Sequence, residues 1–133
     1  LVGGRFGLAT VDVSFISLGA IMGSLVDLIE PDGEALVLVK PQFEVSRSDA
    51  SRGRGVIRSP GLWTEALESV AEAAETHGRV PSGATVSGVR GAKGNTEFFV
   101  RLAHRDDRGG AWAEAHPGWI EALIRSVEVN PDG

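Results

Sequence analysis

The chain has no cysteine among its 133 residues. This absence excludes a disulfide framework, a thiolate metal site and a cysteine nucleophile. No run approaches the roughly 20 consecutive apolar residues that a membrane-spanning helix needs, and no signal-peptide pattern opens the chain. We therefore expect a cytoplasmic protein with no membrane insertion. The three histidines, His77, His104 and His116, lack metal-ligand spacing, so no metal site is predicted.

Positive charge is also scarce, since 13 Lys and Arg face 18 Asp and Glu and the net charge is −5. RNA and DNA are held by neutralising their phosphates, so a surface that binds nucleic acid all round is not expected. The segment from Lys40 to Arg58 nevertheless has five cations and two acids. Its bland interpretation is a solvated, mobile loop, and its functional one is a contact with RNA phosphates. The candidate RNA-binding residues are Arg47, Arg52, Arg54 and Arg58.

The apolar residues recur with the periods of an α/β domain. Short apolar runs rich in β-branched residues predict buried strands, and apolar residues at helical spacing predict helices between them. The predicted strands are 6–13, 35–39, 84–89 and 96–104, the last two forming a hairpin. The predicted helices are 16–29, ended by the turn residues 31–33, then 59–77, and a third beginning at Pro117. Residues 42–58 are predicted to be a long surface loop.

This order predicts an α/β domain whose sheet lacks its opening strands. Residues 1–104 form the partial domain, and residues 105–133 form a charged linker and an amphipathic C-terminal helix. Such a sheet has an unpaired apolar edge near residues 9–13. We expect this edge to pair with a second copy of the chain or to be covered by the C-terminal helix.

Three charged residues interrupt apolar strand-like segments. They are Asp12, Lys40 and Glu97. Charged groups are rarely buried unless they are paired, so convergence of the three at one edge of the sheet would explain all of them. The convergence is equally consistent with a structural ion-pair cluster and with a reaction centre.

Four ordered motifs point to a family. Residues Val11–Leu18, Leu38–Glu44, Gly55–Arg58 and Gly94–Phe99 resemble successive motifs of TlyA (hemolysin A-like) proteins, which are FtsJ-like ribosomal RNA methyltransferases. The resemblance spans roughly residues 8–102. It implies that the chain corresponds to the C-terminal half of a Rossmann-like methyltransferase sheet, with parallel strands and a terminal hairpin.

The resemblance also implies a chemistry. The family transfers a methyl group from S-adenosylmethionine to a ribose 2′-hydroxyl of ribosomal RNA, using a Lys-Asp-Lys-Glu tetrad. Asp12, Lys40 and Glu97 match the aspartate, second lysine and glutamate, and Asp12, Ser14 and Phe15 match the border of the cofactor pocket. Neither the first lysine nor the glycine-rich cofactor loop occurs in this chain. We therefore expect this chain alone to bind the cofactor poorly and to be inactive.

A second hypothesis is a non-catalytic module that binds RNA or protein. The hemolysin name does not by itself predict lysis, because no spanning helix is predicted. Among the aromatic residues, Trp63 is expected to anchor a helix start in the core rather than to stack on a base. Phe15, Phe43, Phe98 and Phe99 are likewise expected in the core.

Overall fold

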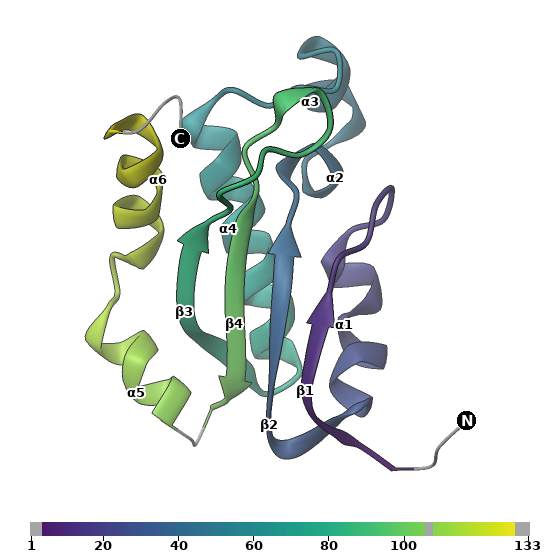
Figure 1. Cartoon of the computed structure of the whole chain (residues 1–133), viewed down its shortest axis with the longest axis vertical. Helices are drawn as coiled ribbons and strands as arrows, with labels where there is room; N and C mark the ends of the chain where they lie inside the picture. The colour runs from purple at the N-terminus through teal and green to yellow at the C-terminus, as the bar shows by residue number, and fades with distance from the viewer. Residues whose placement is uncertain (1–3, 106–107, 130–133) are drawn as a thin grey trace.

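The protein is described by a computed structural model that covers residues 4–105 and 108–129. It contains a four-stranded sheet in the order β1-β2-β4-β3 (Figure 1). The strands are β1 (Phe6–Val11), β2 (Ile29–Val39), β3 (Arg79–Val86) and β4 (Phe98–His104). β1 and β2 are parallel, whereas β4 is antiparallel to both of its neighbours. The predicted hairpin and the α/β class are therefore confirmed.

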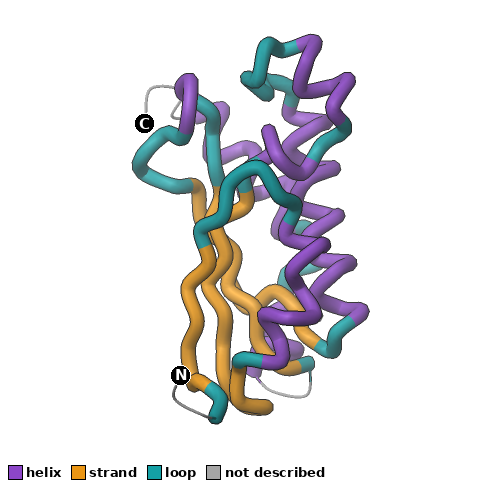
Figure 2. Tube along the Cα trace, turned by 90° about the vertical axis from the view of Figure 1, so that its right-hand side faces the viewer, coloured by secondary structure: helices purple, strands orange, loops and turns teal. Residues whose placement is uncertain are grey.

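Two helices cover one face of the sheet. They are α1 (Leu18–Asp27) and α4 (Pro60–Thr76), and Figure 2 shows the helices gathered on one side of the strands. Each begins at a serine, Ser17 or Ser59, whose hydroxyl accepts a hydrogen bond from the backbone N–H three residues later. Such capping satisfies a backbone donor that the first turn leaves unpaired. Among the described residues, no helix is long and apolar enough to cross a membrane.

The core lies between this helical layer and the sheet. Val37, Val39 and Phe98 point toward the helices and are completely buried, as are Ala66 and Leu67 of α4. On the opposite face, the alternate residues Leu36, Leu38 and Phe99 are only half-buried. One face of the sheet thus forms the core and the other is partly open.

The remaining helices are short or lie beside β3. They are α2 (Pro41–Glu44), α3 (Arg47–Arg52), the 3₁₀ turn η1 (Ala92–Gly94), α5 (Arg108–Ala115) and α6 (Trp119–Val129). The prediction of a loop over 42–58 was wrong in part, because α2 and α3 occupy it. The signal for α3 is Ser46, which caps it by accepting from the Asp49 N–H. α5 occupies part of the expected linker, and the domain boundary after residue 104 stays a prediction.

Residues 31–33 do not end the first helix with a turn, because they lie inside β2. β2 therefore begins at Ile29, and its register with β1 shifts between Phe6 and Leu8. The buried Arg79 guanidinium donates to the Gly33 carbonyl at 2.6 Å and to the Glu30 carbonyl at 3.0 Å. These long-range hydrogen bonds satisfy backbone groups beside Pro31, which a sequence pattern does not reveal.

β1 forms an open edge of the sheet, and its side chains Phe6 and Leu8 are 53% and 61% exposed. α6 packs against α4 and β3, at the opposite edge (Figure 1). The expectation that the C-terminal helix covers β1 was therefore wrong. The apolar residues of α6, including Leu123 and Ile124, complete the core at the β3 side instead.

Candidate functional site

The three predicted site residues lie at the same end of the sheet. Asp12 directly follows β1, Lys40 directly follows β2, and Glu97 directly precedes β4. Val39 pairs with Phe98 in the antiparallel ladder, so the next residues along it are Lys40 and Glu97. The parallel strand β1 ends there too. This end of the sheet, where Asp12, Lys40 and Glu97 lie, is the rim. The carboxyl ends of parallel strands are where open α/β sheets keep their sites.

Lys40 connects two residues of the β1 end. Its ammonium forms an ion pair with the Asp12 carboxylate and donates a hydrogen bond to the Ser14 hydroxyl at 3.0 Å. The Lys40 side chain is 12% exposed, whereas the Asp12 side chain is 67% exposed. The solvent-exposed Asp12 carboxylate thus holds the largely buried Lys40 amine at the rim.

Glu97 is held by a residue that the sequence analysis missed. Its carboxylate accepts a hydrogen bond from the Gln42 Nε2 at 2.9 Å, and both side chains are buried. Among the described residues, no hydrogen bond or ion pair joins Glu97 directly to Lys40. Gln42 lies two residues after Lys40, in the first turn of α2, so it links Glu97 to the Lys40 segment. Among the described residues, the buried Gln42 Oε1 has no hydrogen-bond partner.

Gly91 lies against the Glu97 carboxylate, and a Cβ at this position would overlap it. Gly91→Ala is therefore expected to displace Glu97 from Gln42 and to lower the free energy of unfolding by about 1–3 kcal/mol, as overpacking does. Gly88→Ala is the matched control, because a Cβ there has no heavy atom within 4 Å. Denaturant unfolding and the NMR signal of the Gln42 side-chain amide measure the two effects. Equal stability of both variants would contradict the close approach.

Glu44 tethers α1 to the site, since its carboxylate accepts a hydrogen bond from the Leu18 N–H at 2.7 Å. Burial raises the pKa of the Glu44 carboxyl, and this hydrogen bond opposes the shift. Because folding raises this pKa, the protonated Glu44 carboxyl stabilises the protein at pH values below its pKa in the unfolded state. This stabilisation is lost as the pH rises through its pKa in the folded state.

Glu44→Gln keeps the acceptor and removes the charge. The variant is therefore expected to melt at a higher temperature than the wild type at neutral pH, with the difference shrinking toward acidic pH. Thermal unfolding across the pH range checks this, with Glu68→Gln on the exposed face of α4 as the control. A difference that grows toward acidic pH would show the opposite sign of the shift.

Of the three predicted cofactor residues, Phe15 lines a hollow, whereas Asp12 and Ser14 line none of the hollows described here. Asp12 and Ser14 are engaged by Lys40, and Phe15 is 89% exposed with its ring 5.0 Å from that of Phe43. The expectation that Phe15 lies in the core was wrong. Phe15 has a positive φ of 65° and lines a hollow of about 370 Å³. Among the described residues, no glycine-rich loop lines this hollow.

The four candidate RNA-binding arginines are all exposed but do not form one patch. Arg47 lines the hollow beside Phe15, whereas Arg58 lines a separate hollow with Arg90 and Lys93. Arg52 pairs with Asp49 at 3.4 Å. The prediction for Trp63 is confirmed, because it is 7% exposed and its indole N–H donates to the Ile57 carbonyl.

Asn95 attaches the basic segment, residues 40–58, to the β3–β4 hairpin. Its Oδ1 accepts from the Ile57 N–H at 2.9 Å, and its Nδ2 donates to the Gly55 carbonyl at 2.8 Å. The Lys93 ammonium donates to the Arg54 carbonyl at 3.0 Å. Hydrogen bonds therefore join residues 54–57 to residues 93–95, which are about 40 residues away in the sequence and directly precede Thr96 and Glu97.

Comparison with known proteins identifies relatives of the chain. No family model matches the chain. It is 35% identical over 130 residues to the 16S/23S rRNA (cytidine-2′-O)-methyltransferase TlyA of Mycobacterium tuberculosis, which covers 98% of this chain and 47% of that protein. It is 37% identical over 93 residues to hemolysin A of Brachyspira hyodysenteriae, covering 70% of this chain and 37% of that protein. The chain thus spans about half the length, or less, of these curated relatives.

A solved structure shows the same arrangement. The crystal structure of a protein proposed to be a hemolysin from Lactococcus lactis superposes with a TM-score of 0.80 at 31% identity. The match covers 96% of this chain and 59% of that one. The resemblance that the four sequence motifs indicated is confirmed by these relatives, whose names include both rRNA methyltransferase and hemolysin.

Proposed function

Because the chain is similar over nearly its whole length to TlyA-type rRNA methyltransferases, we propose that it supplies the reaction centre of a ribosomal RNA ribose 2′-O-methyltransferase. The observation that carries this proposal is the position of the Lys40 amine at the rim, paired with Asp12, with the buried Glu97 on the adjacent strand. S-adenosylmethionine would supply the methyl group. The cytoplasm, where ribosomal RNA is found, is the expected compartment.

Each residue has a role that its contacts support. A ribose hydroxyl is a poor nucleophile until its proton is removed, and a lysine amine can accept that proton once it is neutral. Asp12 and Ser14 orient the amine, while Glu97 acts through Gln42 to fix the chain that follows Lys40. In the present arrangement the amine is a hydrogen-bond donor to Asp12 and Ser14. We infer that Lys40 is here an ion-pair partner and that the chain alone is inactive.

The test is a chimera in which this chain replaces the matching part of the M. tuberculosis relative. Transfer of labelled methyl groups to ribosomal RNA is measured for the chimera and for the chain alone, with circular dichroism as the folding control. Methylation by the chimera and none by the chain is the expected result. A folded chimera without activity favours the alternative, a non-catalytic RNA- or protein-binding module.

We also propose that the open edge of β1 joins two copies of the chain. Exposed strand edges offer unpaired backbone groups, and a charge placed on such an edge prevents pairing. Leu8, 61% exposed on β1, is the site for such a charge. Sedimentation equilibrium is expected to show a dimer for the wild type and a monomer for Leu8→Lys. A wild-type monomer throughout the concentration range would exclude this pairing.

A further inference from the structure

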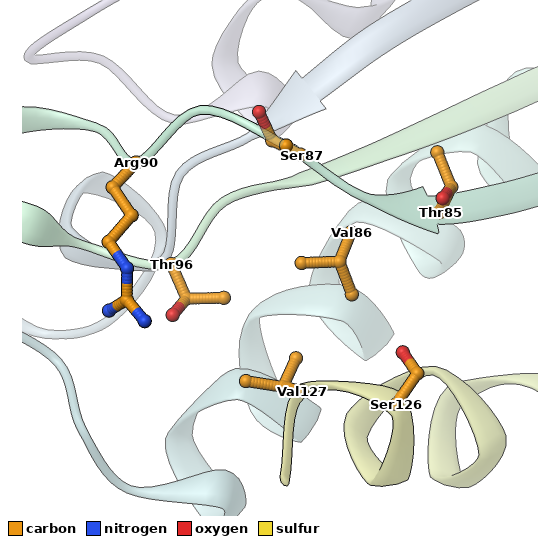
Figure 3. A pocket seen from close by; sticks show the side chains of 8 residues that line it. Thr85, Val86, Ser87, Arg90, Thr96, Ser126 and Val127 are labelled. Atoms are coloured by element: carbon orange, nitrogen blue, oxygen red, sulfur yellow. The ribbon is translucent and has the colours of Figure 1, made fainter. Parts of the chain in front are cut away.

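A groove runs beside the β3–β4 hairpin, and residues of the 56–63 segment and of α5 and α6 line the rest of it. It consists of three hollows of about 500, 240 and 310 Å³. The first and second share Arg90, Thr96 and Val127, and the second and third share Thr85 and Ser126. Figure 3 shows the middle hollow, with the hairpin residues on one side and Ser126 and Val127 of α6 on the other. The shared residues place the three hollows next to one another in a row, which is called the groove here.

One end of the groove is cationic. Arg58, Arg90 and Lys93 line it, and among the described residues no Asp or Glu does. Lys93 donates to the Arg54 carbonyl, and the Arg90 guanidinium donates to the Gly94 carbonyl at 3.3 Å. These bonds help to hold the two side chains at this end of the groove. Three cations on a protein of net charge −5 make this end a local site for anions.

The other end is aromatic. The Trp112 ring is stacked on His116 with ring centroids 4.8 Å apart, and it lies 6.1 Å from Trp119. All three line the third hollow. Aromatic side chains beside a cationic groove are the combination that binds single-stranded nucleic acid, because bases stack on the rings while the cations follow the backbone.

We propose that this groove binds a single-stranded segment of RNA, with phosphates at Arg58, Arg90 and Lys93 and bases against Trp112 and His116. The inference rests on the proposed function, and it specifies how the substrate approaches the rim. Thr96 lines the groove and the next residue, Glu97, lies at the reaction centre. The groove therefore reaches the residue that directly precedes Glu97 at the rim.

The test is binding of a short fluorescein-labelled single-stranded RNA to the chain, measured by fluorescence anisotropy at several salt concentrations. Arg58→Gln is expected to weaken binding and to reduce the slope of log affinity against log salt by about 0.7, the value for one lost phosphate contact. Arg5→Gln is the matched control, because Arg5 is exposed and directly precedes the first residue of β1, away from the end where β1 reaches the rim. Trp112→Leu is expected to weaken binding about 5- to 100-fold with the salt slope unchanged.

The possible results distinguish failure of the groove proposal from failure of the proposed methyl transfer. RNA binding that Arg58→Gln and Trp112→Leu leave at the wild-type level overturns the groove, even if the chimera methylates RNA. Binding of poly-glutamate but not of RNA also overturns it, in favour of an acidic protein partner. Loss of RNA binding in both variants supports the groove, and an inactive chimera would then count only against the proposed methyl transfer.

Discussion

Lys40→Met in the chimera is expected to lower the rate of methyl transfer by about 10²- to 10⁴-fold, the usual contribution of a general base. Lys40 forms an ion pair with Asp12 at the rim, and the Lys40 side chain is only 12% exposed. Stability should change little, because the Asp12 partner is largely exposed and such pairs contribute about 0–1 kcal/mol. Single-turnover transfer of labelled methyl groups, with thermal unfolding in parallel, measures both quantities.

Lys40→Arg tells a base apart from a mere positive charge. Arginine can keep the ion pair with Asp12, but its guanidinium does not lose a proton in proteins. If the amine accepts the ribose proton, Lys40→Arg should be as inactive as Lys40→Met. Activity near the wild-type level in Lys40→Arg would show that the site needs only charge. Arg5→Gln again serves as the control for a remote loss of charge.

Asn95→Ala has the largest effect on stability that we expect, about 2–4 kcal/mol. The side chain is 1% exposed and pairs with two backbone groups, the Ile57 N–H and the Gly55 carbonyl. Alanine leaves the buried Ile57 N–H and the partly buried Gly55 carbonyl without these partners. The Arg58 end of the groove should also lose its fixed position, so RNA binding should weaken in the same variant.

Denaturant unfolding and RNA anisotropy test this prediction together. Glu68→Ala on the exposed face of α4 is the control, since surface substitutions usually stay within about 0.5 kcal/mol. If Asn95→Ala is as stable as this control, the Asn95 side chain does not hold the basic segment in solution. If it is destabilised but binds RNA normally, Arg58 is positioned by other contacts.

Long-range contacts explain which site residues were predicted and which were missed. Asp12, Lys40 and Glu97 were recognisable because each is a charge beside an apolar strand, a local pattern. Gln42 was missed because its signal is the buried contact with Glu97, 55 residues away in sequence. Arg90 and Lys93 were missed because they lie between the two predicted hairpin strands, where no local pattern marks them, and the proximity of this connection to Arg58 depends on Asn95.

The secondary structure also divides into elements that local sequence patterns predict and elements that depend on long-range contacts. Helices α1 and α4 follow from apolar periodicity and serine caps, both local features. The extension of β2 through Pro31 and Gly33 depends on the parallel pairing with β1 and on Arg79, a residue distant in sequence. α6 was predicted as an amphipathic helix, yet its position beside β3 depended on which apolar surface remained uncovered.

The sequence by itself determined the α/β class, the family resemblance and the three charged residues of the rim, because periodicity, caps and motifs are encoded by neighbouring residues. Only the tertiary structure decided that Gln42 joins Glu97 to the Lys40 segment, that Asn95 fixes the basic segment and that cationic and aromatic side chains line neighbouring hollows beside the hairpin. These features depend on packing between segments far apart in the chain, and such contacts leave no local pattern.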